Sequence, residues 1–141
     1  KHNFRRKIMM TETELWYSLN GGLTANAIYM AGTFFLLWVA FRAANQMRAE
    51  DANVFNKTLV SLFSLGIIFN GLNVGAILIA NLQGTAWGFA QLEEISAPAQ
   101  LFVDTWYTGD AGSTSILNNP INVAWWLVIT TMIFGRIWTK N

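Results

Sequence analysis

The chain has 141 residues, of which 53% are hydrophobic and 12% charged, and its net charge is +1. Soluble domains carry about 25% charged residues, so the composition favours a protein of the lipid bilayer, and the balanced charge argues against a nucleic-acid partner. The lack of Cys and the single His, at position 2, exclude disulfides, the common zinc sites and His-based catalysis within the fold.

The first apolar stretch covers residues 22–41 and contains no charged residue. A helix rises about 1.5 Å per residue, so about 20 residues cross the roughly 30 Å hydrocarbon layer of a bilayer. Ala27 and Ala31 lie one turn apart and predict a close helix contact. The bulky residues that follow predict a lipid-facing surface, and the segment Asn20 to Gly22 predicts a turn before the helix.

The residues before this stretch raise the possibility of a signal peptide, because four of the first seven are Lys or Arg. The apolar stretch is longer than the roughly 7–15 residues of a signal core, so we expect a retained span. Met10 makes a natural start, and we expect residues 1–9 to carry little structure.

The second apolar stretch covers residues 59–82, and its small and polar residues gather on two faces of the expected helix. At about 100° per residue the two faces lie roughly 150° apart. One face holds Gly66, Asn70, Asn73 and Asn81, and the other holds Ser64, Gly71 and Gly75. Glycines one turn apart allow a neighbouring helix to approach closely. We therefore predict helix packing on both faces.

The amides of this stretch need partners, because an unpaired amide at membrane depth costs on the order of several kcal/mol. We expect the Asn side chains to bond to another helix. The alternative is a polar pathway or ligand pocket around Asn70 and Asn73.

The segment 83–120 contains four acidic residues and neither Lys nor Arg. It is too long for a simple connection, so we expect a small helical cap outside the membrane. Ser96 is a suitable N-cap for a short helix with Pro98 in its first turn. A turn-rich stretch follows at 108–115. The residues expected to form a partner-docking loop are Leu101, Phe102, Trp106 and Tyr107.

The third apolar stretch covers residues 121–138. Asn119 is a suitable N-cap, and Pro120 fits the first turn because the missing N–H costs nothing there. Thr130 and Thr131 can bond to the backbone of their own helix. Arg136, near the end, is expected to reach the lipid headgroups.

The distribution of basic residues predicts the orientation, because cytoplasmic loops are enriched in Lys and Arg. The link between the first two spans contains Arg42, Arg48 and Lys57, and the tail contains Arg136 and Lys140. We therefore expect the N-terminus and the 83–120 loop outside and the C-terminus inside, as in a bacterial cytoplasmic membrane.

Aromatic residues at the two membrane interfaces would agree with this orientation. The expected outer set is Trp16, Tyr17, Trp87, Trp106, Tyr107, Trp125 and Trp126, and the inner set is Trp38 and Trp138.

Taken together, these patterns predict an all-α integral membrane protein in which 1–141 form a single membrane domain with three transmembrane helices. No span contains His, Cys or a carboxylate, so we expect no catalytic residue, metal or other cofactor. We expect a non-catalytic accessory or scaffold subunit, with lipid and other integral membrane subunits as partners in a homo- or hetero-oligomer. The alternatives are an oligomeric small-solute channel or transporter component with an Asn-lined path, a membrane enzyme, or a soluble helical bundle.

Overall fold

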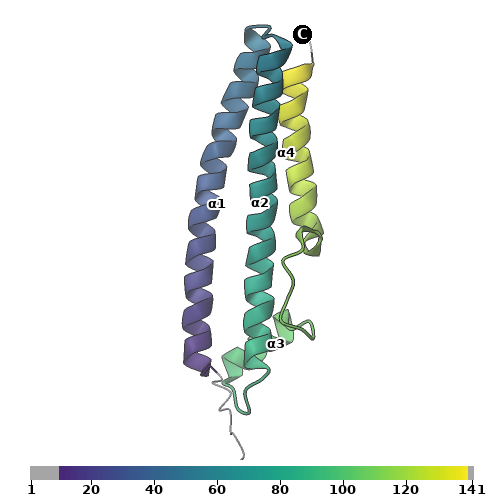
Figure 1. Ribbon diagram of the computed structural model, residues 1–141. Coiled ribbons are helices and arrows are strands. Elements are labelled where there is room, and N and C mark those ends of the chain that lie inside the picture. The colour runs from purple at the N-terminus through teal and green to yellow at the C-terminus, as the bar shows by residue number, and fades with distance from the viewer. Residues whose placement is uncertain (1–9, 140–141) are drawn as a thin grey trace, which may run out of the picture.

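The computed structural model describes residues 10–139, and the predictions for residues 1–9 lie outside this range. Every regular element within it is a helix (Figure 1). The elements are α1 (Glu12–Ala49), α2 (Val54–Phe89), α3 (Ala97–Trp106), the short 3₁₀ helix η1 (Ile116–Asn118) and α4 (Pro120–Trp138). Helices α1, α2 and α4 are long and apolar enough to cross a membrane. The predicted all-α fold with three candidate transmembrane helices is confirmed.

The helices α1 and α2 are much longer than the apolar stretches inside them. They contain 38 and 36 residues, against 19 in α4. At about 1.5 Å per residue, α1 and α2 extend over about 55 Å and α4 over about 28 Å. Only α4 therefore matches the roughly 30 Å hydrocarbon thickness of a bilayer along its whole length.

The predicted turn at Asn20 to Gly22 is wrong, because α1 already begins at Glu12. Its start is set by a capping box, in which the Thr11 side chain accepts from the Glu14 amide and the Glu14 carboxylate accepts from the Thr11 amide. Two glycines inside a helix each cost about 1 kcal/mol relative to alanine. Gly22 lies against Asn81 of α2, whereas Gly21 is exposed.

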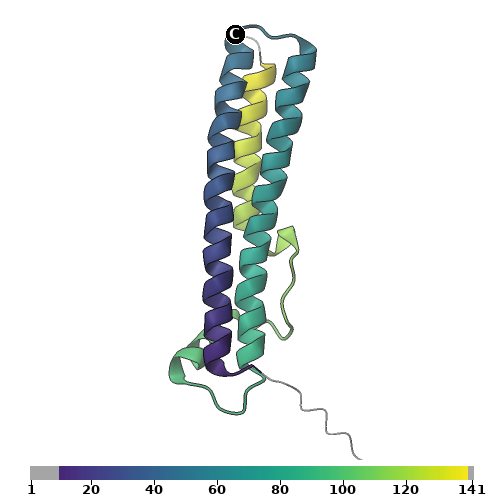
Figure 2. The same cartoon turned by 60° about the vertical axis from the view of Figure 1, so that its left-hand side comes forward.

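A tight turn joins α1 to α2 and makes them antiparallel neighbours (Figure 2). Asp51 has a positive φ of 43°, a conformation that short polar side chains tolerate. The Asn53 side chain then accepts a hydrogen bond from the Asn56 amide and caps α2.

Helix α4 packs against both long helices over the half of their length nearer the α1–α2 turn, and its end lies beside that turn (Figures 1 and 2). The contact is mainly apolar, and near the turn Arg136 and Trp138 of α4 donate hydrogen bonds to Asn45 of α1 and Ser61 of α2. We call it the three-helix core, and its buried residues are Leu37, Ala40, Ala44, Ile67, Ile68, Trp126, Ile129, Ile133 and Ile137.

A second, smaller core lies at the opposite end, where α3 packs against the ends of α1 and α2. We call it the end core; Leu15, Phe89 and Ala99 are its buried residues. The rings of Trp16, Phe89 and Phe102 contact one another, with centroid distances of 4.8 Å from Trp16 to Phe89, 5.4 Å from Trp16 to Phe102 and 5.8 Å between the two Phe rings. The apolar face of α3 is therefore used inside the protein.

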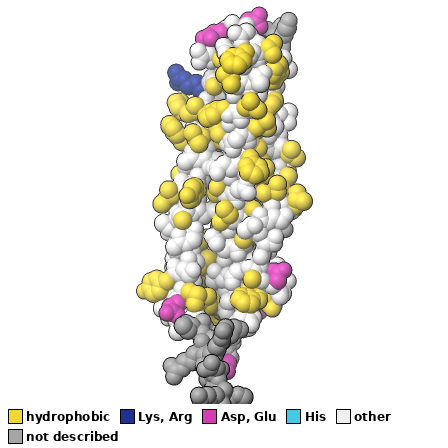
Figure 3. Space-filling view, viewed as in Figure 1, with side chains coloured by type: hydrophobic (Ala, Val, Ile, Leu, Met, Phe, Trp, Pro, Cys, Tyr) yellow, Lys and Arg dark blue, Asp and Glu magenta, His cyan; other side chains and the backbone are white. Residues whose placement is uncertain are grey.

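The surface between these ends suits a lipid environment. On the face seen in Figure 3, the Lys, Arg, Asp and Glu side chains lie towards the two ends of the molecule. Large hydrophobic side chains such as Ile28, Phe69 and Leu127 are exposed along the helices between them. Such exposure is costly in water and favourable in hydrocarbon.

Candidate functional site: the amide face of α2

The glycine face of α2 is closed by α4. A Cβ atom at Gly71 would lie 1.9 Å from Cζ2 of Trp126, and one at Gly75 would lie 2.4 Å from Nδ2 of Asn122. Only glycine leaves room for these side chains at this helix separation. Gly71 and Gly75 therefore lie at a helix contact within the chain.

Trp126, one of the aromatic residues expected at the outer membrane interface, is buried inside the protein. Its side chain is only 2% exposed and lies between α2 and α4, whereas its neighbour Trp125 is 57% exposed. The space left by Gly71 accommodates the indole ring, and the pairing of these two residues could not be inferred from hydropathy.

The amide face of α2, defined by Gly66, Asn70, Asn73 and Asn81, has a different environment. The Asn70 Nδ2 atom donates a 2.8 Å hydrogen bond to Thr33 Oγ1 on α1. The Thr33 hydroxyl in turn donates to the backbone oxygen of Tyr29 at 2.9 Å. Asn70 thus links the two helices, while its side chain remains largely exposed.

Asn26 on α1 provides a second polar link that the sequence analysis missed. Its Nδ2 atom donates a 2.8 Å hydrogen bond to the backbone oxygen of Val74, and the residue is 8% exposed. A signal was present, because Leu19, Asn26, Thr33 and Ala40 recur every seven residues and all are buried. That spacing places them on the face of α1 that packs against α2.

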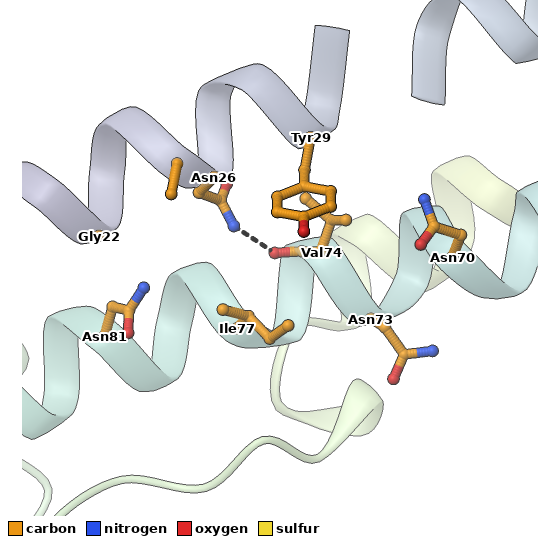
Figure 4. Close-up of a pocket in the computed structure, with 9 residues that line it drawn as sticks. Gly22, Asn26, Tyr29, Asn70, Asn73, Val74, Ile77 and Asn81 are labelled. Atoms are coloured by element: carbon orange, nitrogen blue, oxygen red, sulfur yellow. Dashed lines mark hydrogen bonds between the residues drawn. The ribbon is translucent and has the colours of Figure 1, made fainter. Parts of the chain in front are cut away.

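The other two amides of this face, those of Asn73 and Asn81, donate no hydrogen bond to α1 among the described residues. Asn73 donates to the Phe69 backbone oxygen of its own helix at 2.7 Å and points away from α1 (Figure 4). Asn81 lies opposite Gly22, where a Cβ atom would be 3.1 Å from the Asn81 amide nitrogen. The predicted stripe therefore contains both intrachain contacts and outward-facing groups.

These side chains surround a groove of about 230 Å³ between α1 and α2 (Figure 4). All its lining residues come from these two helices: Gly22, Ala25, Asn26, Tyr29, Asn70, Asn73, Val74, Ile77 and Asn81. The groove brings the predicted Asn70, Asn73 and Asn81 together with Asn26 and Tyr29.

Three residues predicted to pack helices have no such contact within the described part of the chain. Ala27 and Ala31 are exposed, because α1 packs against α2 through the opposite face that contains Asn26 and Thr33. Gly66 is also exposed, and a Cβ atom there would meet no described atom within 4 Å.

The predicted docking loop divides between core and surface. Phe102 is half-buried and packs against the end core, where its ring contacts Trp16 and Phe89 of the same chain. Trp106 is half-buried, whereas Leu101 and Tyr107 are exposed. Only the last two belong to an open surface.

A carboxylate fixes α3 at this end. The Glu12 oxygens accept hydrogen bonds from the Ser96 amide at 2.9 Å and from the Ser96 hydroxyl at 2.6 Å. These two bonds stabilise the ionised form and lower the pKa of Glu12, with a further contribution from the Trp16 Nε1–H. The same Ser96 hydroxyl accepts from the Ala99 amide and caps α3.

Comparison with known proteins adds no relative: no family model, no curated protein and no solved structure matches this chain. Within residues 10–139, no group of three or more His, Cys, Asp or Glu side chains is placed to hold a metal ion. The described chemistry of the site is that of amide and hydroxyl groups.

Proposed function

We propose that this chain is a non-catalytic accessory or scaffold subunit of a larger membrane protein complex. The observation that carries the proposal is the exposure of Asn70 on a candidate membrane span. Asn70 lies at the middle of the 59–82 apolar stretch, about 17 Å from either end. At that depth lipid offers no hydrogen-bond partner, so another protein segment is the favourable neighbour.

The surroundings of Asn70 support contact with a helix. Gly66 lies one turn away and has open space where a side chain would be. A small residue beside a hydrogen-bonding residue is the combination by which membrane helices approach closely and associate. A lipid chain would fill the space but would offer no partner to the Asn70 Oδ1 atom or to the N–H that does not bond to Thr33.

The matched variants Asn73→Leu and Met132→Leu test this proposal. Among residues 10–139, Asn73 bonds only within its own helix, so its replacement leaves the Asn26–Val74 and Asn70–Thr33 hydrogen bonds between α1 and α2 in place. Met132 is exposed on α4. After gentle purification from native membranes, wild type and Met132→Leu should retain associated membrane subunits, and Asn73→Leu should retain several-fold less. Recovery of all three proteins as the same isolated chain with lipid would overturn the proposal.

We also propose the orientation with the α3 end outside the cytoplasm. The helix ends beside the α1–α2 turn contain Arg42, Arg48, Lys57 and Arg136, whereas segment 83–120 contains no basic residue. Because the chain has no Cys, Asn56→Cys and Thr114→Cys can be compared in intact cells with a membrane-impermeant maleimide. Thr114→Cys should react and Asn56→Cys should not; the reverse pattern would invert the orientation.

A second candidate function is an oligomeric small-solute channel or transporter component. The groove lined by Asn26, Asn70, Asn73 and Asn81 favours it. Liposomes that contain the purified chain should then show a solute flux that Asn73→Leu reduces. Absence of flux from liposomes that contain the intact oligomer would leave only the scaffold proposal.

A further inference from the structure

The residues around the amide face follow a heptad spacing, and all of them except the half-buried Asn73 are exposed. On the groove side of α2 they occur at positions 59, 63, 66, 70, 73 and 77, with steps of four, three, four, three and four. Leu59, Phe63 and Ile77 are between 43% and 50% exposed. Alternating steps of four and three form the seam of a left-handed pair of helices. We call these six positions the heptad seam.

The heptad seam is separate from the contacts that α2 makes with α4. Gly71 and Gly75 face α4, and Ser64 and Ile68 are buried. The seam passes instead along the open side of α2, beside the groove whose lining comes from α1 and α2 alone. The three-helix core can therefore remain intact while this side of α2 receives another helix.

We infer that the heptad seam packs against the same seam of a second copy of this chain, with the two α2 helices parallel. This inference rests on the proposed function and identifies one of its partners. Copies inserted in the same orientation are related by a two-fold axis along the membrane normal, so each seam residue meets its own counterpart at the same depth.

A second copy can supply the hydrogen-bond partners that the Asn side chains of the heptad seam need. An Asn side chain contains both a donor and an acceptor, so it is complementary to another Asn. Among residues 10–139, the Asn70 side chain makes one hydrogen bond, through Nδ2 to Thr33, and Asn73 makes one, to Phe69. Their Oδ1 atoms and their second N–H groups remain available. An identical copy supplies these groups at the required depth.

The residues around the amides agree with this arrangement. Asn side chains are short, so the two backbones must come close for the amides to meet. Gly66 has no described atom within 4 Å of a Cβ position and permits that approach. Phe63 and Ile77 provide apolar contacts on either side of this central section. Asn at a core position of a heptad also specifies register and the number of helices.

Cysteine cross-linking at one depth but on two faces of α2 provides the test. The variants are Gly66→Cys on the seam and Leu65→Cys as its matched control, since Leu65 is exposed but lies one residue away, about 100° around the helix. The full chain contains no other Cys. After oxidation in lipid nanodiscs or dilute micelles, Gly66→Cys should form covalent dimers in at least tenfold higher yield.

A second measurement distinguishes the loss of dimerisation from misfolding of a variant. Sedimentation of the Cys-free chain in density-matched micelles should give the mass of a dimer, and Asn73→Leu should weaken dimerisation at least tenfold while far-UV circular dichroism stays unchanged. Equal cross-linking of Gly66→Cys and Leu65→Cys, or a monomer in sedimentation, would overturn the inference.

The two proposals fail in different ways. A purified monomer that still binds other membrane subunits through Asn73 would show a different protein on the seam, so the second-copy inference would fall and the scaffold function would stand. A monomer that also binds no subunit in native membranes would remove both.

Discussion

The two faces of α2 contain similar residue types but differ in how they are covered. The space beside Gly71 and Gly75 is occupied by the side chains of Trp126 and Asn122 of α4. In contrast, Asn70 and Asn73 line the groove, and the space beside Gly66 is open. The space beside a glycine can be occupied by any side chain of suitable shape, and at Gly71 that side chain is Trp126 of the same chain. An amide needs donors and acceptors at defined positions, and α1 supplies only part of them through Thr33. Among the described residues, unpaired amide atoms therefore occur on both faces: Asn70 and Asn73 have them on the open side, and Nδ2 of Asn122 is buried without a partner on the covered side.

The largest effect is expected from Trp126→Ala on the covered face. Removal of a buried aromatic side chain leaves a cavity and typically costs about 3–5 kcal/mol. Unfolding in mixed micelles, followed by circular dichroism, measures the loss. The neighbouring Trp125 is exposed, so Trp125→Ala should cost much less. Equal losses in the two variants would contradict the covered-face interpretation.

A somewhat smaller effect is expected from adding one methyl group to each face. Gly71→Ala places Cβ within 1.9 Å of the Trp126 ring, and overpacking of this kind costs about 1–3 kcal/mol. Gly66→Ala meets no described atom within 4 Å and removes a helix glycine, so it should be neutral or stabilise the monomer by about 0.5–1 kcal/mol. The same unfolding assay, run on dilute protein, compares them; a loss of stability in Gly66→Ala equal to that in Gly71→Ala would contradict the expectation.

The hydrogen bond from the amide face to α1 should contribute less. A double-mutant cycle with Asn70→Ala and Thr33→Ala should give a coupling energy of about 0.5–1.7 kcal/mol, the range found for bonds between membrane helices. Asn73 bonds to its own helix, so a cycle with Asn73→Ala and Thr33→Ala should give none. A coupling in the second cycle equal to that in the first would contradict the assigned partners.

The smallest and most local effect concerns the end core. Ser96 lowers the pKa of the Glu12 carboxyl below its ordinary value of 4.5, so the Glu12–Ser96 contact stabilises the folded state above that ordinary pKa and is lost as the pH falls through the lowered one. Hydrogen exchange in α3 should therefore accelerate on acidification below about pH 4.5.

The variant Glu12→Gln isolates this contribution. It should give faster exchange in α3 already at pH 7 and a weaker response to acid. The control is Glu14→Gln: hydrogen bonds from Thr11 lower the pKa of Glu14 as well, but its loss should loosen only the first turn of α1. Acceleration in α3 by both variants alike would show that Glu12 does not fix this helix.

Local signals predicted several features of the fold because their physics is local. Ser96 and Asn119 cap α3 and α4 as expected, and Thr130 and Thr131 donate to the backbone of their own helix. Each feature depends on residues within about one turn. The positions where α1 and α2 begin and end were less predictable from hydropathy, because a capped helix continues past the apolar stretch that defines a span.

The site was predicted in part. The grouping of Asn70, Asn73 and Asn81 follows from helical periodicity, and all three line the groove. Asn26 was missed because the mean hydropathy of an apolar stretch changes little with one Asn and does not show whether that side chain faces another helix. Ala27 and Ala31 were assigned to a helix contact from spacing alone, which says nothing about which face meets a neighbour.

The amino-acid sequence by itself determined that the chain forms three long apolar helices, where α3 and α4 are capped and which residues share each side of α2, since these follow from composition, periodicity and bonds within one turn. Only the tertiary structure decided that Trp126 fills the gap at Gly71, that Asn26 and Thr33 bind α1 to α2, and that Phe102 belongs to the end core. These contacts join residues far apart in the chain, so they depend on how the helices rotate and slide against each other until shape and hydrogen bonds are satisfied together.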